Sequence, residues 1–412
     1  MTTRTNENEA GRQVAEFKDP WTGRGSLDEL VAELRRQQET KLDFVCDVRQ
    51  LLLGIHDDAE PGKEREALTM FARPGSGMAS ELVPDGGLRV KDQALQQMGD
   101  RSGPNIPWTY LQRLRDERPL TAVDLLNQTH FDMQSRRFIR CLDGKVRAVL
   151  SDRYRVIDNY DIAFSALQVA HQHGGEVIEA ALSDKRMRIK FTSRDVWDVI
   201  NETRRDPNSG NWYAGGLGNQ KHLSAVSART RGELPGGPGT VHPLVTVRNS
   251  ETGHGGFGVR VGILKGICFN LATVEDVVTQ VHLGGSLEPG LFSAEAIEAD
   301  TKAIMLKARD AVAGAFKLDV FRKLVARVRA SQDATIEDAS HAAENVVKHT
   351  AVLEGELDSL LAYFHRDYDA TAFGMAQAVS RLAQDTVDAE HAADLEDAAG
   401  EIMLRPAMVA AV

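Results

Sequence analysis

One stretch, residues 138–170, constrains the fold more than any other because it joins a tight turn to a helix. Two apolar runs, 138–142 and 146–150, flank the pair Asp143-Gly144, which is typical of a two-residue β-hairpin turn. Asp158-Asn159 can then cap a helix, and apolar residues recur at helical spacing as far as Ala170. The stretch therefore predicts a β-hairpin followed by a helix.

The rest of the central sequence repeats this alternation. Strands are expected at 177–182 and 187–191, a further hairpin at 241–248 and 257–264, and a helix capped by Thr273. The order is hairpin, helix, hairpin, long loop, hairpin, helix. It favours an α+β fold with a central curved antiparallel sheet that carries helices on one face and is flanked by N- and C-terminal helical regions.

Periodicity and composition divide the chain into four parts. Residues 1–20 are polar and aperiodic, and are expected to form a disordered tail. Residues 21–135 are expected to form a mainly helical N-terminal domain, whose first helix continues to Leu53. Residues 136–285 are the expected α+β core domain, and residues 286–412 a helical C-terminal domain.

Charge is unevenly distributed along the chain. Residues 136–270 contain 20 Lys and Arg against 13 Asp and Glu, whereas residues 271–412 contain 12 against 24. A basic centre between acidic flanks indicates a polyanionic partner for the centre. An alternative interpretation is that the two regions neutralise each other within the fold.

Residues 201–240 interleave basic and aromatic side chains without periodicity. A connection of this length is usually functional or disordered, and its composition is typical of a single-strand-binding loop. Arg188 and Lys190 share one face of their expected strand and could contact successive phosphates. The expected nucleic-acid-binding residues are Arg147, Arg153, Tyr154, Arg155, Lys185, Arg186, Arg188, Lys190, Arg204, Arg205, Trp212, Tyr213, Lys221, Arg229 and Arg231.

Sequence motifs for catalysis and for metal binding are not found. There is no nucleophile elbow, Walker loop or His-Glu-x-x-His, and His242, His254 and Cys268 lack the spacing of a zinc site. Asp152 and Asp158 could bind magnesium, but the arginines around them favour ion pairs. We therefore expect no catalytic residue, cofactor or metal, and an enzyme is the weaker interpretation.

Residues 147–154 read R-A-V-L-S-D-R-Y, and the apolar pair Val156-Ile157 and the N-x-D of residues 159–161 follow shortly after. This segment resembles the central motif of a phage- and plasmid-borne family, the domain-of-unknown-function family nine hundred and thirty-two. Weaker similarities, such as R-N-S at 248–250 and C-F-N at 268–270, extend the resemblance over about residues 88–383. The chain departs from the family after Asn127, where members often have Trp. The resemblance implies a mobile element but supplies no activity.

The expected order of elements is also similar to that of phage single-strand annealing proteins, which line a basic groove between sheet and helix and assemble into rings or filaments. The leading hypothesis is therefore a homo-oligomeric single-stranded DNA-binding and annealing protein of a phage or other mobile element. The alternatives are a protein-interaction module that inhibits a host defence system through its acidic tail, and a metal-dependent nuclease.

The sequence also predicts where the protein is located. No apolar run is long enough to cross a bilayer, and the polar N-terminus lacks the apolar core of a signal peptide. The three cysteines are odd in number and far apart, which suits a reducing compartment. We therefore expect no membrane association and a location in the cytoplasm of a bacterial host.

Overall fold

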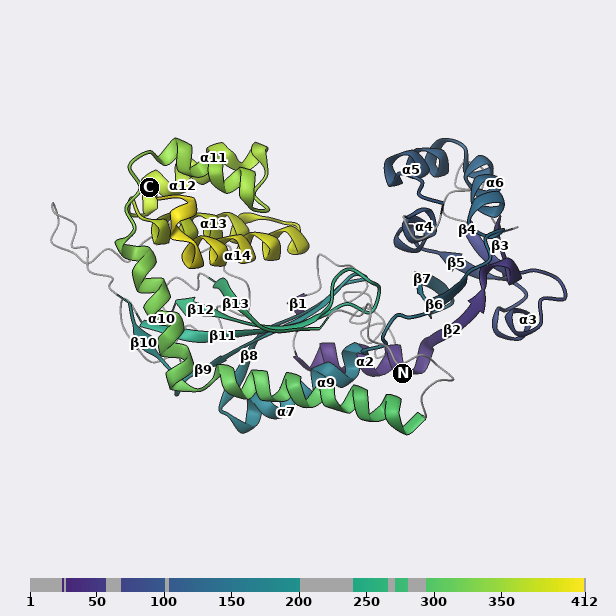
Figure 1. Cartoon of the computed structure of the whole chain (residues 1–412), viewed down its shortest axis with the longest axis horizontal. Coiled ribbons are helices and arrows are strands. Elements are labelled where there is room, and N and C mark those ends of the chain that lie inside the picture. The colour runs from purple at the N-terminus through teal and green to yellow at the C-terminus, as the bar shows by residue number, and fades with distance from the viewer. Residues whose placement is uncertain are drawn as a thin grey trace, which may run out of the picture.

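The computed structural model describes residues 24–25, 27–56, 68–100, 104–200, 240–265, 271–280 and 294–410. These residues form three regions: an N-terminal lobe, a central sheet with helices on it, and a C-terminal helical bundle (Figure 1). The α+β class predicted from the sequence is confirmed. Within the described part of the chain, no helix is both long and apolar enough to cross a membrane.

The N-terminal lobe contains a six-stranded sheet, sheet B, in addition to the expected helices. Its strands in spatial order are β2 (Lys41–Asp47), β6 (Arg136–Leu142), β7 (Lys145–Ser151), β5 (Leu88–Val90), β4 (Leu68–Ala72) and β3 (Leu51–Ile55). Its helices are α3 (Met78–Leu82), α4 (Asp92–Gly99), α5 (Trp108–Glu117) and α6 (Pro119–Thr129).

The prediction of one helix as far as Leu53 is wrong. The first helix, α2 (Leu27–Thr40), ends where β2 begins. Burial then alternates along the strands, so that Phe44 and Cys46 on β2 are buried while their neighbours are more exposed. This period of two is that of a strand, and the apolar residues were assigned to a helix because their spacing fits both patterns over a short distance.

The hairpin predicted around Asp143-Gly144 is confirmed. The two residues have φ angles of 52° and 70°, as a turn with two left-handed central residues requires. The hairpin strands β6 and β7 belong to sheet B, however, because β6 pairs with β2 along its whole length. The N-terminal lobe therefore extends to Ser151, beyond the boundary expected at residue 135.

The central sheet, sheet A, is built from the two later hairpins and has seven strands. Their order is β1 (Arg24–Gly25), β8 (Gly175–Leu182), β9 (Met187–Ser193), β11 (Thr240–Asn249), β12 (Phe257–Lys265) and β13 (Leu271–Gln280), with β10 (Asp198–Val199) paired to the start of β11. The helix predicted from Thr273 is wrong, because this segment is strand β13. Its threonines and valines are β-branched and favour a strand.

Helices cover both faces of sheet A. On one side lie α2, α7 (Asn159–Gln172) and α9 (Ala294–Ala315); on the other lie α13 (Ala372–Asp385) and α14 (Ala389–Leu404) (Figure 1). The bundle is completed by α10 (Leu318–Asp333), α11 (Ala339–His349) and α12 (Leu357–Asp367). In α10, Phe321, Leu324, Val325 and Val328 recur at helical spacing and are all buried.

Candidate nucleic-acid interface and the buried ionic junction

The expected binding residues divide into those that the structure describes and those that it does not. Arg204, Arg205, Trp212, Tyr213, Lys221, Arg229 and Arg231 lie outside the described residues. Of the remaining eight, Arg153 and Lys185 are exposed. The other six are buried or partly buried, and they contact other parts of the chain as follows.

Lys190 lies between sheet A and α14 and is only 1% exposed. Its Nζ is 2.8 Å from Oε2 of Glu396 on α14 and 3.3 Å from Oε2 of Glu179 on β8. Burial raises the pKa of the Glu396 carboxyl, because its charged form loses solvation by water. Lys190 is therefore a partner in an internal ion pair and is not accessible to a polyanion in this conformation.

The other cations on this face of sheet A also pair with α14. Arg186 Nη1 lies 2.9 Å from Glu390 Oε2, and Arg188 Nη2 lies 3.7 Å from the same oxygen. Arg260 on β12 forms an ion pair with Asp397. The carboxylates of α14 are thus turned toward the basic face of sheet A. This arrangement matches the interpretation in which the basic centre and the acidic tail neutralise each other.

Helix α14 is part of the core and not a loosely attached segment. Leu395, Ala399 and Ile402 are completely buried in the same cluster as the apolar residues of sheet A. Burying such side chains contributes roughly 1.5–3 kcal/mol each for the larger ones. Removing α14 would expose the basic face of sheet A, but the stabilisation from these buried side chains would be lost.

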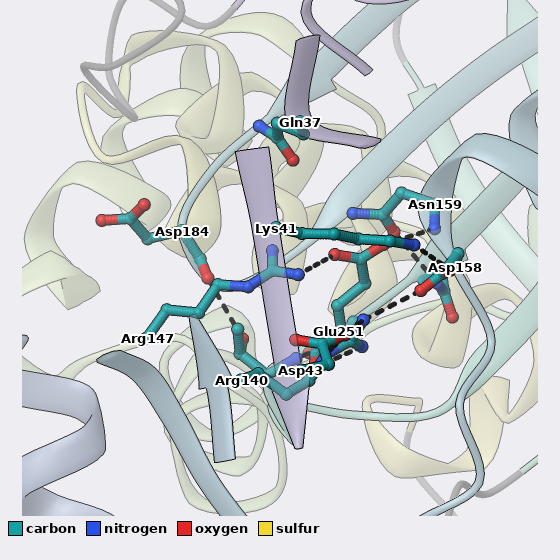
Figure 2. A network of polar contacts seen from close by, with 12 residues as sticks. Gln37, Lys41, Asp43, Arg140, Arg147, Asp158, Asn159, Asp184 and Glu251 are labelled. Carbon is teal, nitrogen blue, oxygen red and sulfur yellow. Dashed lines mark hydrogen bonds and ion pairs between the residues drawn. The ribbon is translucent and has the colours of Figure 1, made fainter. Parts of the chain in front are cut away.

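A second group of ions is buried where the N-terminal lobe meets sheet A (Figure 2). The Arg140 side chain is 0% exposed, and its Nη2 lies 2.7 Å from Asp43 Oδ2 and 2.9 Å from Asp158 Oδ1. Its Nη1 donates to the Glu251 carbonyl oxygen at 3.1 Å. Lys41 Nζ lies 2.6 Å from the second oxygen of Asp158. We call this set, with Arg147, the ionic junction.

Asp158 occupies the N-cap position of α7, but its carboxylate does not cap the helix. It binds Arg140 and Lys41 instead. Burial alone would raise the pKa of Asp158, but these two cations more than compensate and hold it below the usual value. The cap comes from Glu251, whose Oε1 accepts a hydrogen bond of 2.6 Å from the Asn159 backbone N–H. The expected cap by Asp158 is therefore corrected.

Glu251 also pairs with the first arginine of the R-A-V-L-S-D-R-Y segment. Its Oε2 lies 2.6 Å from Arg147 Nη2, and both side chains are less than 10% exposed. Tyr154, at the end of the same segment, is 6% exposed and donates a hydrogen bond of 2.8 Å to the Ser250 carbonyl oxygen. The two similarity motifs, around residues 147–154 and 248–250, thus meet in space. Their residues connect the N-terminal lobe to sheet A, and the Tyr154 ring is not available to stack on a base.

Two further residues of this motif contact their surroundings. The Ser151 hydroxyl accepts a hydrogen bond from the Arg153 backbone N–H, a contact typical of turns. Arg155 forms an ion pair of 2.6 Å with Asp300 on α9. Sequence reasoning missed Asp43, Arg140 and Glu251; the signal for Arg140 was an arginine inside an otherwise apolar strand.

Among the described residues, no group of three or more His, Cys, Asp and Glu side chains is arranged to hold a metal ion. Asp158, one of the two carboxylates of the nuclease hypothesis, forms ion pairs with Arg140 and Lys41. Burial raises the pKa of the Cys46 thiol to about 11 and of the Cys141 thiol to about 12, so neither is a reactive thiolate at neutral pH.

An exposed cationic surface lies elsewhere, on α10. Residues 317–329 contain five Lys and Arg and a single carboxylate, Asp319. Side-chain exposure is 64% for Arg322 and 42% for Arg329, and Lys317 and Lys323 are also exposed. Because residues 271–412 are acidic as a whole, their summed charge does not reveal this basic segment.

An exposed aromatic residue directly precedes the strand that contacts this helix. Trp197 is 47% exposed and directly precedes β10, which lies beside α10 (Figure 1). Asp198 of β10 contacts Arg329 at 3.1 Å and Arg322 at 3.8 Å. We call Trp197, Lys317, Arg322 and Lys323 the α10 surface.

Comparison with known proteins adds no relative: no family model, curated protein or solved structure matches the chain.

Proposed function

We propose that this protein binds single-stranded nucleic acid, and that the α10 surface forms the interface. The observation that carries this proposal is the contact of β10, which the exposed Trp197 directly precedes, with the cationic helix α10. Single-stranded nucleic acids are bound by cations that contact the phosphates together with aromatic rings on which bases stack. Trp197 supplies the ring, and Arg322 and Lys323 supply accessible charge.

The position of the α10 surface also supports this proposal. β10 and the start of β11 pair with each other, with Val199 opposite Thr240. They are the strands that bracket residues 201–239, whose sequence predicts a basic and aromatic binding loop. The described strands on either side of that segment therefore lie near α10.

Membership in the phage and plasmid family and a role in strand annealing are part of the same proposal. The motif at 147–154 supports the first, and the antiparallel sheet with its basic face supports the second. Because the basic face of sheet A pairs with α14, the bound strand is assigned to the α10 surface and not to a groove between the sheet and that helix. A cytoplasmic location in a bacterial host follows from this role.

The interaction-module alternative has less support. It relied on the acidic tail as an open binding surface, whereas Glu390, Glu396 and Asp397 of α14 pair with cations of sheet A. Carboxylates that are already neutralised contribute little to the binding of a basic partner.

The proposal is tested by fluorescence titration of a labelled oligothymidylate over a series of salt concentrations. Replacing both Arg322 and Lys323 by Ala should reduce the slope of log affinity against log salt by about 1.4, or about 0.7 per lost phosphate contact. Trp197→Ala should instead weaken binding by ~1–3 kcal/mol with little change in slope, because stacking releases no counterions.

A matched control replaces Arg113 and Arg118 by Ala. Arg113 lies on α5 and Arg118 directly follows that helix; both are exposed and belong to the N-terminal lobe, away from α10 (Figure 1). The control removes the same charge and should leave the affinity and slope nearly unchanged. Absence of salt-dependent binding by the wild-type protein, or an equal effect of the two double variants, would contradict the proposal.

A further inference from the structure

We infer that Asp198 competes with the phosphates of a bound strand for Arg322, and so limits the affinity of the α10 surface. This inference rests on the proposed function. Asp198 belongs to β10 and is 22% exposed; its Oδ2 lies 3.8 Å from Arg322 Nε and its Oδ1 lies 3.1 Å from Arg329 Nη2.

The two arginines around Asp198 have different surroundings. Arg329 Nη2 also donates to the Val199 carbonyl oxygen, so this side chain is held by two acceptors of β10. Arg322 is 64% exposed, and its ion pair with Asp198 is the single one it makes within the described part of the chain. Arg329 therefore positions β10, and with it the adjacent Trp197, while Arg322 remains available to another anion.

Exchange of the carboxylate for a phosphate at Arg322 is physically easy. A phosphodiester and a carboxylate carry the same charge, so a phosphate can take the place of Asp198. The pair to be broken is long and exposed, and such pairs are typically worth about 0.2–1 kcal/mol. Once displaced, the Asp198 carboxylate still lies beside the bound phosphate and repels it. Asp198 thus lowers affinity both by competition and by repulsion.

The variant that tests this is Asp198→Asn. Its amide keeps an oxygen that can accept the hydrogen bond from the Val199 backbone N–H, which is 2.7 Å long in the structure. Without the charge, the affinity for labelled oligothymidylate should rise about 1.4–5-fold, the range that corresponds to a weak exposed ion pair. The thermal unfolding midpoint should stay that of the wild type, which shows that β10 remains in place.

A double-mutant cycle separates competition at Arg322 from a general change of charge. In the Arg322→Ala background, Asp198→Asn should have less than half of its effect on log affinity, because the contested group is gone. The control is Asp319→Asn, which removes an exposed carboxylate from α10 itself. Its effect should be the same with and without Arg322.

The outcomes distinguish the inference from the function on which it rests. If the wild type shows no salt-dependent binding, the proposed function fails. If it binds, and Arg322→Ala weakens binding, but Asp198→Asn leaves affinity unchanged, lowers it, or raises it equally in both backgrounds, the inference alone is overturned.

Discussion

Arg140 illustrates how a buried charge becomes necessary to a fold. Its guanidinium is surrounded by Asp43 of the N-terminal lobe and by Asp158 and the Glu251 carbonyl oxygen of the central region. Deleting one member of such a group leaves the other charges buried and unpaired, which costs far more than the net value of the pair.

We therefore predict that Arg140→Ala destabilises the protein by about 3–5 kcal/mol in urea unfolding. Arg113→Ala is the control, since this arginine is 74% exposed and pairs with Glu117 one helical turn away. Its cost should be about 0.5 kcal/mol or less. Similar losses of unfolding free energy in both variants would mean that the ionic junction does not connect the N-terminal lobe to sheet A.

His130 is a residue-scale determinant of acid stability. The side chain is 1% exposed and stacks edge-on against Phe131, with ring centroids 5.0 Å apart. Burial, together with the nearby Arg137, lowers the pKa of His130 to about 4 from the usual 6.5. As pH falls, the unfolded chain therefore binds the proton first.

The stabilisation that depends on neutral His130 is fully present above about pH 6.5 and is lost as pH falls toward 4. Between pH 7 and pH 5 the loss should be about 2 kcal/mol. Between pH 7 and pH 5, the free energy of unfolding of the His130→Leu variant should fall by about 2 kcal/mol less than that of the wild type. Urea unfolding at both pH values measures this difference. Parallel pH profiles of the two proteins would refute the assignment.

At the scale of single elements, backbone conformation decides the effect of two glycines. Gly144 in the β6–β7 turn has a φ of 70°, whereas Gly314 lies in helix α9. A Cβ added at either position would meet no atom within 4 Å. The two sites therefore differ in backbone conformation and not in available space.

We predict that Gly144→Ala destabilises the protein by about 1–2 kcal/mol, because left-handed backbone is unfavourable for Ala. Gly314→Ala should stabilise it by about 0.4–1 kcal/mol, because Ala restricts the unfolded chain and favours a helix. Thermal unfolding of both variants checks the pair. A change of the same sign at both positions would contradict the role given to the turn.

At the scale of the whole molecule, polar contacts connect the N-terminal lobe to sheet A. Gln93 and Gln97 of α4 both donate to the Thr252 carbonyl oxygen, and Lys91 pairs with Asp184 at 2.6 Å. Together with the ionic junction, these contacts place the β11–β12 turn against the lobe.

Assembly is the whole-molecule prediction that follows from the annealing proposal. If the protein anneals strands, we expect light scattering to show a homo-oligomer in the presence of an oligonucleotide. The double variant lacking Arg322 and Lys323 serves as the control, since it should bind the oligonucleotide more weakly. A monomer with and without DNA would exclude the annealing role and leave single-strand binding itself intact.

Local patterns in the sequence were enough to determine several elements. Three predicted features are present: the hairpin at Asp143-Gly144, the helix that follows Asp158, and the alternation of Arg188 and Lys190 with apolar residues. Turn chemistry and periodicity act within a few residues, so they can be read without knowing the fold. The predictions were wrong where the spacing of apolar residues fits both a helix and a strand, as in β2 and β13.

Only the tertiary structure decided which charges are accessible. Lys190 meets Glu396 across more than 200 positions of sequence, and β6 joins sheet B through its pairing with β2. Neither pairing can be recognised from the neighbouring sequence, because both depend on how the whole chain packs. The strand pattern predicted that Arg188 and Lys190 share a face; packing placed α14 on that face and left the cations of α10 exposed to solvent.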